Sequence, residues 1–563
     1  MNMDFQQEII KLLVKETKLK KEEIIPLISI PPDPKLGDYA FPCFKLNKNP
    51  KAAAEKLKQK ISLPKFLQKI ETVGPYLNFY LNQTTIAKET LTKIQKEKQD
   101  YGKGTEKSKI VIEYCGPNTN KPLHLGHVRN MALGNSVYKI LNFSGNKVHP
   151  VNIINDRGIH ICQSMIAYRK WGKNKQPNKK GDHFVGDYYV LFSKKAKEDE
   201  KLKLEAQETL LKWERKDKAT LELWKKMNHW VLEGFKETYK RFGISFEKEY
   251  FESKYYHKGK DIVLEGFKKK IFEKDETEAI YANLEAFNLP NKVLLRGDET
   301  SVYITQDLYL AHQRYQDFKF NKLLYVVASE QRTHFKQLFK ILELLKKPYA
   351  KNLHHLSYGL VNLPSGRMKS REGTVVDADD IMDETSQLAE KEITKRHKNL
   401  NKKETKKRAE IISLGAIKFF MLKNDPTRDI VFNPEESLSF EGETGPYLQY
   451  THARACSILR KAKNTPYSKV KFDQLKLAEE LAVIKLLYNF PQIINKASHT
   501  YKPSLIAQYL ISLAQAFNEF YHKCPVISER DEQMKARLLL VDSVKQVLQN
   551  GLDLLGIQAP EEM

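Results

Sequence analysis

The alternation of apolar and polar positions between residues 109 and 156 predicts a strand, a helix and a second strand. Residues 109–115 (KIVIEYC) form a short β-branched run that is typical of a buried strand, and turn residues follow at 116–120. The apolar face of the next, helical stretch carries Leu133, Val137, Ile140 and Leu141. The helix is expected to end near Gly145, before a second strand at 148–154. Such a β-α-β unit predicts a parallel sheet with a right-handed crossover.

A second group of apolar runs lies between residues 291 and 390. Residues 292–296 and 301–305 indicate two strands around a turn, and we expect a helix to start at Asp307. Residues 323–328 (LLYVVA) form a continuous apolar run, which is typical of a parallel strand buried on both faces. The two groups together predict one parallel sheet, and any ligand is expected at the carboxyl ends of its strands.

The remaining segments have different patterns. Residues 1–100 combine amphipathic helices with an alternating strand at 74–81, which predicts a small α+β module. Residues 441–563 show helical periodicity almost throughout. The predicted divisions of the chain are 1–100, 101–170, 171–290, 291–390, 391–440 and 441–563.

Residues 171–290 separate the two groups of predicted strands as an insertion. A polar, basic linker at 173–180 precedes a strongly helical stretch at 201–241. Its candidate core residues are Leu210, Leu211, Trp213, Leu221, Trp224, Trp230, Val231 and Phe235. We expect the tryptophans to be packing residues.

The composition of the chain indicates which kind of molecule the protein binds. The 563 residues are too many for a single core, and 95 Lys and Arg against 70 Asp and Glu give a net charge of +25. This balance favours a polyanion such as nucleic acid, although a lysine-rich, solubilising surface would give it too. The basic stretch 391–408 is compatible either with RNA contact or with a solvated helix face.

Cysteine usage and hydropathy bear on the compartment. The five cysteines are scattered without a CxxC pair, which argues against a disulfide framework or a zinc knuckle and predicts a reducing cytoplasm. The chain has no apolar run of about 18 residues, so no membrane contact is expected. It also lacks a Walker P-loop and a GxGxxG fingerprint.

The first candidate chemistry is His124-Leu125-Gly126-His127, at the start of the predicted helix. Residues three apart on a helix share one face, and a helix N-terminus favours an anion. Gly126 would let a flat ring approach the backbone. Taken alone, the pair is more typical of a surface helix or a metal site than of an anion site.

Further motifs follow in a fixed order. A glycine-bracketed basic loop spans 366–373 (GRMKSREG), and the histidines are preceded by residues 113–118 (EYCGPN) and 121–122 (KP). Residues 303–308 (YITQDL) and 445–450 (GPYLQY), with Ala453-Arg454, complete the set. The histidine pair and the basic loop resemble the HIGH and KMSKS signatures of class I aminoacyl-tRNA synthetases. The whole set resembles arginyl-tRNA synthetases over nearly the full chain.

The resemblance implies an α/β fold. Its catalytic domain would be a Rossmann-like parallel sheet with a helical insertion. A small α+β N-terminal domain that contacts tRNA and an all-α C-terminal anticodon-binding domain would flank it. The implied activity is arginine–tRNA ligation: ATP and L-arginine form arginyl-adenylate and pyrophosphate, and arginine then passes to the 3′-terminal ribose of tRNA(Arg). Mg²⁺ would accompany ATP, with no tightly bound protein metal, and activation would require bound tRNA.

The resemblance also implies roles for individual residues. The catalytic set would be His124, His127, Lys121, Lys369, Ser370 and Arg371. The residues implied to bind ATP are His124, Gly126, His127, Met368 and Lys369. Those implied to bind arginine are Glu113, Gly116, Pro117, Asn118, His127, Tyr303, Asp307 and Gln331. Tyr303 and Asp307 would take the guanidinium side, with Glu113 assisting, because a carboxylate can accept two parallel bonds from a planar cation.

The basic loop departs from the family's wider pattern. Ser370 stands where the second lysine of the signature is usual, and a lysine occurs one place earlier, at Lys369. By resemblance, Lys121 before the histidines substitutes for it; otherwise Lys121 is a loop lysine in solvent. The division of phosphate charge between Lys121 and the 367–371 loop therefore stays open.

Two other functions compete with the ligase. One is a nucleotidyltransferase with a HIGH-type site, against which the basic surface and the C-terminal helical segment argue. The other is a synthetase-like paralogue that binds tRNA without activity, which the altered basic loop keeps open. A monomer is expected by resemblance.

Overall fold

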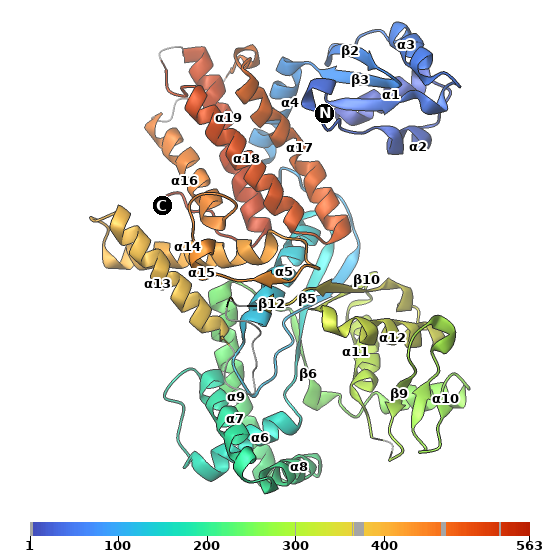
Figure 1. The fold of residues 1–563 in the computed structure, drawn as a ribbon, viewed down its shortest axis with the longest axis vertical. Coiled ribbons are helices and arrows are strands. Elements are labelled where there is room, and N and C mark those ends of the chain that lie inside the picture. Colours follow the sequence, from blue (N-terminus) through green and yellow to red (C-terminus); the bar gives the residue numbers. More distant parts are fainter. Residues whose placement is uncertain (1–3, 299, 363, 365–375, 463–468, 529–530) are drawn as a thin grey trace.

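The computed structural model describes residues 4–298, 300–362, 364, 376–462, 469–528 and 531–563. A parallel sheet lies at the centre of the molecule (Figure 1). The small N-terminal domain and a helical bundle lie together at one end of the view, and a helical insertion extends from the other end (Figure 1). The basic loop residues 367–371, with Met368, Lys369, Ser370 and Arg371, fall outside the described residues.

The central sheet has five parallel strands in the order β11-β10-β4-β5-β6. The strands are β4 (Lys109–Glu113), β5 (Lys147–Ile154), β6 (Lys248–Phe251), β10 (Lys322–Ala328) and β11 (Leu353–Tyr358). The predicted parallel sheet is confirmed. From β4 the strand order runs to β5 on one side and to β10 on the other, so a crevice opens at the carboxyl end of β4.

Helix α5 (Leu125–Phe143) crosses from β4 to β5, as the apolar pattern predicted. It ends at Ser144, and Gly145 has φ +97°, a conformation that side chains rarely adopt. Inside the helix, a Cβ atom on Gly134 would lie 2.3 Å from Cγ of Tyr114. The missing side chain therefore allows α5 to pack closely against the end of β4, which brings the helix N-terminus to the crevice.

The predicted strand at 301–305 is wrong, because helix α11 (Tyr303–Phe318) already begins at Tyr303. The Val302 amide donates to Oγ1 of Thr305 at 3.1 Å, and that hydroxyl donates in turn to the Leu294 carbonyl. The β-branched residues thus cap a helix start instead of pairing as a strand. The preceding strand, β9 (Lys292–Leu295), joins β7 (Glu273–Lys274) and β8 (Ile280–Ala282) in a small antiparallel sheet.

The insertion contains α6 (Ile159–Trp171), α7 (Gly181–Glu198), α8 (Lys201–Glu214) and α9 (Lys218–Phe242), and α10 (Lys260–Lys268) follows β6. Trp213, Val231 and Phe235 are buried as expected. Leu211 is not a core residue: half of its side chain is exposed. The helical stretch is broken at 215–217 between α8 and α9, and Leu211 lies on the outer face of α8.

The N-terminal domain is α+β, as predicted. Its sheet has the antiparallel order β1-β3-β2, formed by β1 (Tyr39–Pro42), β2 (Leu67–Val73) and β3 (Tyr76–Leu81). Its helices are α1 (Phe5–Glu16), α2 (Lys21–Ile24), α3 (Pro50–Lys60) and α4 (Gln83–Glu97). The domain contacts the helical bundle through the hydroxyls of Tyr39 and Tyr488, 3.1 Å apart, and an ion pair between Asp38 and Lys485.

The C-terminal part is helical. It comprises α13 (Ala378–Arg396), α14 (Lys402–Leu422), α15 (Pro434–Ser437), α16 (Gly445–Lys461), α17 (Ala478–Thr500), α18 (Ser504–Lys523) and α19 (Asp531–Leu554). The short strands β12 (Val361–Asn362) and β13 (Ile430–Val431) pair next to it. The hydroxyl of Ser136 on α5 donates to the Leu554 carbonyl at 2.8 Å, and Lys139 pairs with Asp553. Helix α5 therefore touches both the crevice and the bundle.

Two expectations from composition concern the whole chain. All five cysteines are buried and free, so no disulfide framework exists. Among the described residues, no helix is long and apolar enough to cross a membrane.

Candidate active site

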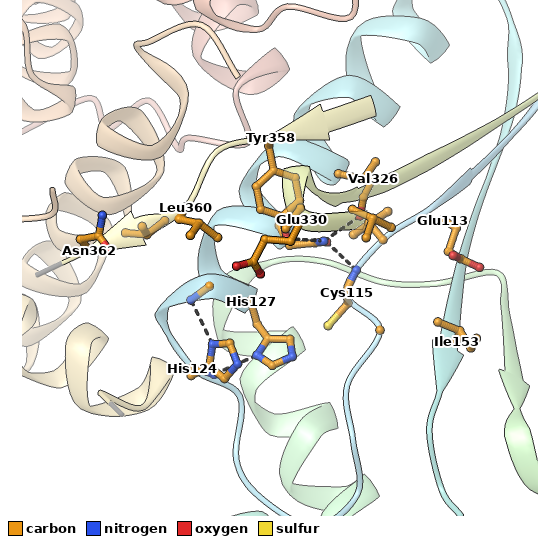
Figure 2. A pocket seen from close by; sticks show the side chains of 17 residues that line it. Glu113, Cys115, His124, His127, Ile153, Val326, Glu330, Tyr358, Leu360 and Asn362 are labelled. Atoms are coloured by element: carbon orange, nitrogen blue, oxygen red, sulfur yellow. Dashed lines mark hydrogen bonds between the residues drawn. The ribbon is translucent and has the colours of Figure 1, made fainter. Parts of the chain in front are cut away.

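A cavity of about 530 Å³ lies at the carboxyl ends of β4, β5 and β10, beside the start of α5 (Figure 2). Its lining comprises Glu113, Tyr114, Cys115, Gly116, His124, Gly126, His127, Asn130, Ile153, Val326, Val327, Ala328, Glu330, Tyr358, Leu360, Val361 and Asn362. Five of the residues implied by resemblance are therefore brought together here: Glu113, Gly116, His124, Gly126 and His127. The switch-point rule located the cavity correctly.

The two histidines cap the first turn of α5. Nδ1 of His124 accepts the Gly126 amide at 3.1 Å, and Nδ1 of His127 accepts the His124 amide at 3.1 Å (Figure 2). Because each Nδ1 acts as an acceptor, the proton of each neutral ring resides on Nε2. Both residues are thus set to donate an N–H from Nε2, and their ring centroids lie 4.0 Å apart.

Burial keeps both rings neutral. It lowers the pKa of His124 to about 4, with a smaller contribution from the nearby charge of Lys121. Burial, followed by His124 and Lys121, also lowers the pKa of His127 well below its ordinary value. The pair therefore acts near pH 7 as two neutral hydrogen-bond donors, and Lys121 is the cation that stands close to them.

Gly126 has a reason for being glycine that the sequence did not reveal. A Cβ atom at this position would lie 2.9 Å from Cε1 and 3.0 Å from Nδ1 of His124. The glycine therefore leaves room for the His124 ring. Close approach of a ligand ring, as first expected, stays a prediction.

Two asparagines that the sequence analysis missed fix the turn after β4. Cys115 and Gly116 both have left-handed backbones, with φ +82° and +64°. The Cys115 amide donates to Oδ1 of Asn130 at 2.6 Å, and the Gly116 amide donates to Oδ1 of Asn152 at 3.0 Å. The Asn130 amide group also donates to the Val326 carbonyl at 2.8 Å (Figure 2). The sequence could have indicated these two residues, because each asparagine interrupts an otherwise apolar helix or strand and a buried polar side chain needs a hydrogen-bond partner.

Three of the residues expected to bind arginine lie near the starts of two helices. Tyr303 and Asp307 lie four residues apart on α11, and Tyr303 is 78% exposed. Gln331 is the exposed cap residue of α12 (Arg332–Leu344) and follows Glu330, which lines the cavity. None of these three described residues is among those that line the cavity, so the structure does not place them in it.

Asp307 lies in an acidic group that sequence patterns did not indicate. Glu252 is buried, and its pKa is raised to about 7. Burial is the largest cause; Arg157 opposes the rise, and Asp156 and Asp307 add to it. Nη1 of Arg157 lies 4.0 Å from Oε1 of Glu252. The signal available was a carboxylate directly after strand β6, at the same sheet edge as the cavity.

Three of the implied residues, Glu113, Pro117 and Asn118, already have protein partners. The Glu113 carboxylate forms an ion pair with Arg314, which is almost completely buried. The carbonyl of Pro117 accepts a hydrogen bond from the backbone amide of Asn155 at 3.0 Å. The backbone of Asn118, an exposed residue, forms an isolated parallel β-bridge with Asn155. The assistance of Glu113 in binding arginine remains a prediction.

The chain returns to the histidines immediately after the basic loop. The Leu125 amide donates to the Val376 carbonyl at 3.2 Å, and the Ala378 amide donates to the Leu123 carbonyl at 2.8 Å. These two backbone hydrogen bonds hold residues 376–378, which follow the loop, against residues 123–125 at the start of α5.

One group of side chains has metal-ligand chemistry. It consists of Asp182, His183 and Asp379, whose ligand atoms lie within 4.8 Å of one another. The ammonium group of Lys180 is 3.0 Å from Asp182 and 2.6 Å from Asp379. A protein cation therefore already balances these carboxylates, which fits an ion-pair network that joins the insertion to α13.

Comparison with known families decides the class. A family model described as "tRNA synthetases class I (R), catalytic domain" matches residues 90–434, which is more than half of the chain. The chain belongs to the arginyl-tRNA synthetases. The models "Arginyl tRNA synthetase N terminal domain" and "DALR anticodon binding domain" match residues 3–81 and 448–563.

Individual arginyl-tRNA synthetases agree with this assignment. The arginine–tRNA ligase of Treponema denticola is 46% identical over 95% of this chain and 94% of the relative. That of Phocaeicola vulgatus is 43% identical over 93% of each chain. The solved arginyl-tRNA synthetase of Thermus thermophilus has a TM-score of 0.85 at 27% identity, over 99% of this chain and 100% of that one. The competing nucleotidyltransferase is set aside.

Proposed function

We propose that the cavity at the start of α5 binds ATP and that the adjoining first turns of α11 and α12 bind arginine. The protein is an ATP-dependent arginine–tRNA ligase that forms arginyl-adenylate and transfers arginine to tRNA. The observation that supports the location of the chemistry is the pair of Nε2–H donors of His124 and His127 beside the crevice.

Activation requires that the charge of the phosphates be held while the arginine carboxylate attacks the α-phosphorus. The two neutral histidines donate N–H groups to the phosphates, and the N-terminus of α5 adds its partial positive charge. Lys121 supplies a full positive charge next to them. Mg²⁺ enters with ATP and takes most of its ligands from phosphate and water. Met368, Lys369, Ser370 and Arg371 keep the phosphate-binding roles implied by resemblance.

Arginine is recognised at two ends. Gly116, Pro117 and Asn118 lie at the turn after β4 and take its amino and carboxylate end together with Gln331. Asp307 and Tyr303 take the guanidinium, and we add Glu252, whose carboxylate lies close enough to Asp307 to interact electrostatically. A cationic ligand between two carboxylates relieves their repulsion, so binding should favour the ionised form of Glu252.

The helical bundle offers a surface for the anticodon loop. Tyr450 and Tyr521 are each 39% exposed, and the Arg454 guanidinium lies 4.8 Å and 5.6 Å from their ring centroids. These side chains line a cavity of about 810 Å³ that also contains Arg460 and Lys461. Exposed rings with interleaved cations suit unstacked bases and phosphates. By contrast, Gln449 is fully buried and serves packing.

The N-terminal domain offers a second, smaller contact. Phe44 and Tyr76 are 57% and 40% exposed, and their rings meet edge-on at 5.9 Å. The basic helix α3 belongs to the same domain. We assign this pair to stacking against an unpaired tRNA base.

The test is aminoacylation with tRNA, labelled ATP and a panel of amino acids. Only arginine should be charged at an appreciable rate, and charging of another amino acid in its place would contradict the proposal. In the variant Asp307→Ala, arginine use should be lost while ATP binding, followed by equilibrium dialysis, stays close to normal. Asp261→Ala, an exposed carboxylate on α10, is the matched control. Equal loss of ATP binding in Asp307→Ala would indicate structural damage.

A further inference from the structure

A histidine with no assigned role contacts the proposed arginine-binding carboxylate. Nε2 of His334 lies 2.7 Å from Oδ2 of Asp307, and the two side chains are 18% and 30% exposed. Asp307 lies on the first turn and a half of α11, and His334 on the first turn of α12. The bond therefore joins the two helix starts that carry the proposed arginine-binding residues.

We propose that His334 is a positioning residue for arginine selection: it holds the Asp307 carboxylate in the orientation that the guanidinium requires. The inference rests on the proposed role of Asp307. His334 does not itself need to touch arginine. Its N–H uses one acceptor site of Oδ2, and the remaining sites of the carboxylate stay free for the guanidinium.

The structure makes His334 a fixed donor. The next residue, Phe335, stacks on His355 of β11 with ring centroids 4.4 Å apart, and it packs against Tyr325 of β10 at 5.0 Å. Nε of Arg332 donates to the hydroxyl of Ser357 on β11 at 3.0 Å. The first turn of α12 is thereby fastened to the central sheet on both sides of His334. Because the sheet holds His334 in place, the hydrogen bond from His334 can hold the Asp307 carboxylate of α11 in one orientation.

Asp307 needs such a partner. The torsion that orients an aspartate carboxylate has broad, shallow preferences, so the partly exposed Asp307 would otherwise sample several orientations. Its charge also acts on Glu252, whose pKa it raises, and on Tyr325. One charge-assisted hydrogen bond is enough to fix the carboxylate and to reduce this repulsion.

Gln331 strengthens the inference. It caps α12 three residues before His334, so both side chains leave the same helical turn. A single bond from His334 to Asp307 therefore also sets the distance between α11 and the residue proposed to hold the other end of arginine. Loss of the bond should affect arginine without affecting ATP, which binds at α5.

The experiment compares His334→Leu with His334→Gln in the full-length protein, and measures KM for arginine and for ATP in tRNA charging. Leucine removes the donor, so KM for arginine should rise about tenfold or more while KM for ATP changes less than twofold. Glutamine keeps an N–H of similar reach and should recover most of the loss. His229→Leu, at an exposed position on α9, is the matched control.

A double-mutant cycle separates positioning from a general structural role. In an Asp307→Asn background, the change His334→Leu should add little to the rise in KM for arginine, because the two residues act as one unit. Additive effects, a similar rise in KM for ATP, or no rescue by glutamine would overturn the inference. If Asp307→Asn leaves KM for arginine unchanged, the proposed function of Asp307 fails. If only the His334 variants have no effect, the inference about His334 fails alone.

Discussion

The hydrogen bonds that side chains at the candidate active site already make determine which of their atoms are left for a ligand. The two histidines of the HIGH-like motif use Nδ1 to cap α5, which leaves Nε2–H as their only polar group for a ligand. Their lowered pKa values mean that they bring no charge near pH 7. At the proposed site, the positive charge at the phosphates would therefore come from Lys121, the basic loop, the helix terminus and a metal ion, and not from the histidines.

Replacement of His124 by Asn should slow arginine activation. It removes one preorganised donor to the phosphates, so kcat for tRNA-dependent pyrophosphate exchange should fall by about 10²–10³-fold. KM for arginine should change little, because His124 belongs to the proposed ATP-binding residues and not to the proposed arginine-binding residues. His229→Asn is the control, and a fall in kcat of less than threefold would show that His124 does not act on the transition state.

Glu252 should make arginine binding depend on pH. Its pKa in the folded protein is raised to about 7, and binding of a cation favours the ionised form. KM for arginine should therefore fall as the pH rises from 6 to 8. In Glu252→Gln this dependence should be lost, and KM should be high throughout. A wild-type KM that is constant over this range would contradict the role given to Glu252.

The same carboxylate should also affect stability. Since the folded pKa lies above the ordinary value of 4.5, the folded protein favours protonated Glu252, and its contribution to stability falls as the pH rises from 4.5 to 7. The shift corresponds to about 3 kcal/mol. The free energy of unfolding, measured by urea denaturation, should therefore fall more between pH 5 and pH 8 in the wild type than in Glu252→Gln.

At the scale of elements, α5 is the connection between the site and the rest of the molecule. Arg129, one turn after the histidines, is buried and donates to four backbone carbonyls, those of Gly359, Leu360, Pro426 and Arg428. These carbonyls belong to the two segments that lead into β12 and β13. Since Leu360 also lines the cavity, Arg129 fixes one wall of the site to the helix that carries its donors.

Replacement of Arg129 by Met should destabilise the protein strongly. The methionine fills much of the space but leaves four carbonyls without their donor, so the free energy of unfolding should fall by about 3–5 kcal/mol. Urea denaturation of Arg129→Met, compared with Arg169→Met on the exposed face of α6, measures this. A loss below about 1 kcal/mol would mean that water or a rearranged backbone replaces the guanidinium.

At the scale of the whole molecule, the site and the proposed tRNA surfaces share α5 and the helical bundle. Bonds from Ser136 and Lys139 join α5 to the end of α19, and Tyr39 and Asp38 join the N-terminal domain to α17. The proposed anticodon surface is on α16 and α18 of the same bundle. A ligand on the bundle can therefore act on the helix that carries the histidines. Monomeric state and cytoplasmic location remain predictions.

Arginine activation should depend on tRNA. Exchange of pyrophosphate into ATP with arginine alone should be at background level and should appear when tRNA(Arg) is added. Tyr450→Ala should raise the tRNA concentration needed for half-maximal exchange by about tenfold, since loss of one stacked base costs about 1–3 kcal/mol. Tyr488, a partly buried residue of α17 that contacts the N-terminal domain, is no suitable control. Tyr281→Ala, on β8, serves instead. Full-rate exchange without tRNA would contradict the prediction.

The sequence alone determined the strands at 109–115, 148–154 and 323–328, the helix between the first two and the position of the histidines at its start. These features depend on local periodicity and on turn residues, which neighbouring positions encode. The motifs also identified the family. The segment 301–305 was misassigned because β-branched residues favour strands unless a tertiary contact, here Thr305 with Leu294, stabilises a helix start.

Tertiary structure decided which distant residues meet. Glu252, Asp156 and Asp307 come from three separate segments, and only the parallel sheet brings them to one edge. The packing of helices on the sheet likewise decides three further pairings. Glu113 pairs with Arg314, Asp307 with His334, and Arg129 with four carbonyls. Sequence patterns record which face of an element is apolar, but not which polar atom on another element completes its hydrogen bonds. The packing of the elements decides which polar atoms pair. These pairings in turn set the charge and the orientation of the groups at the site.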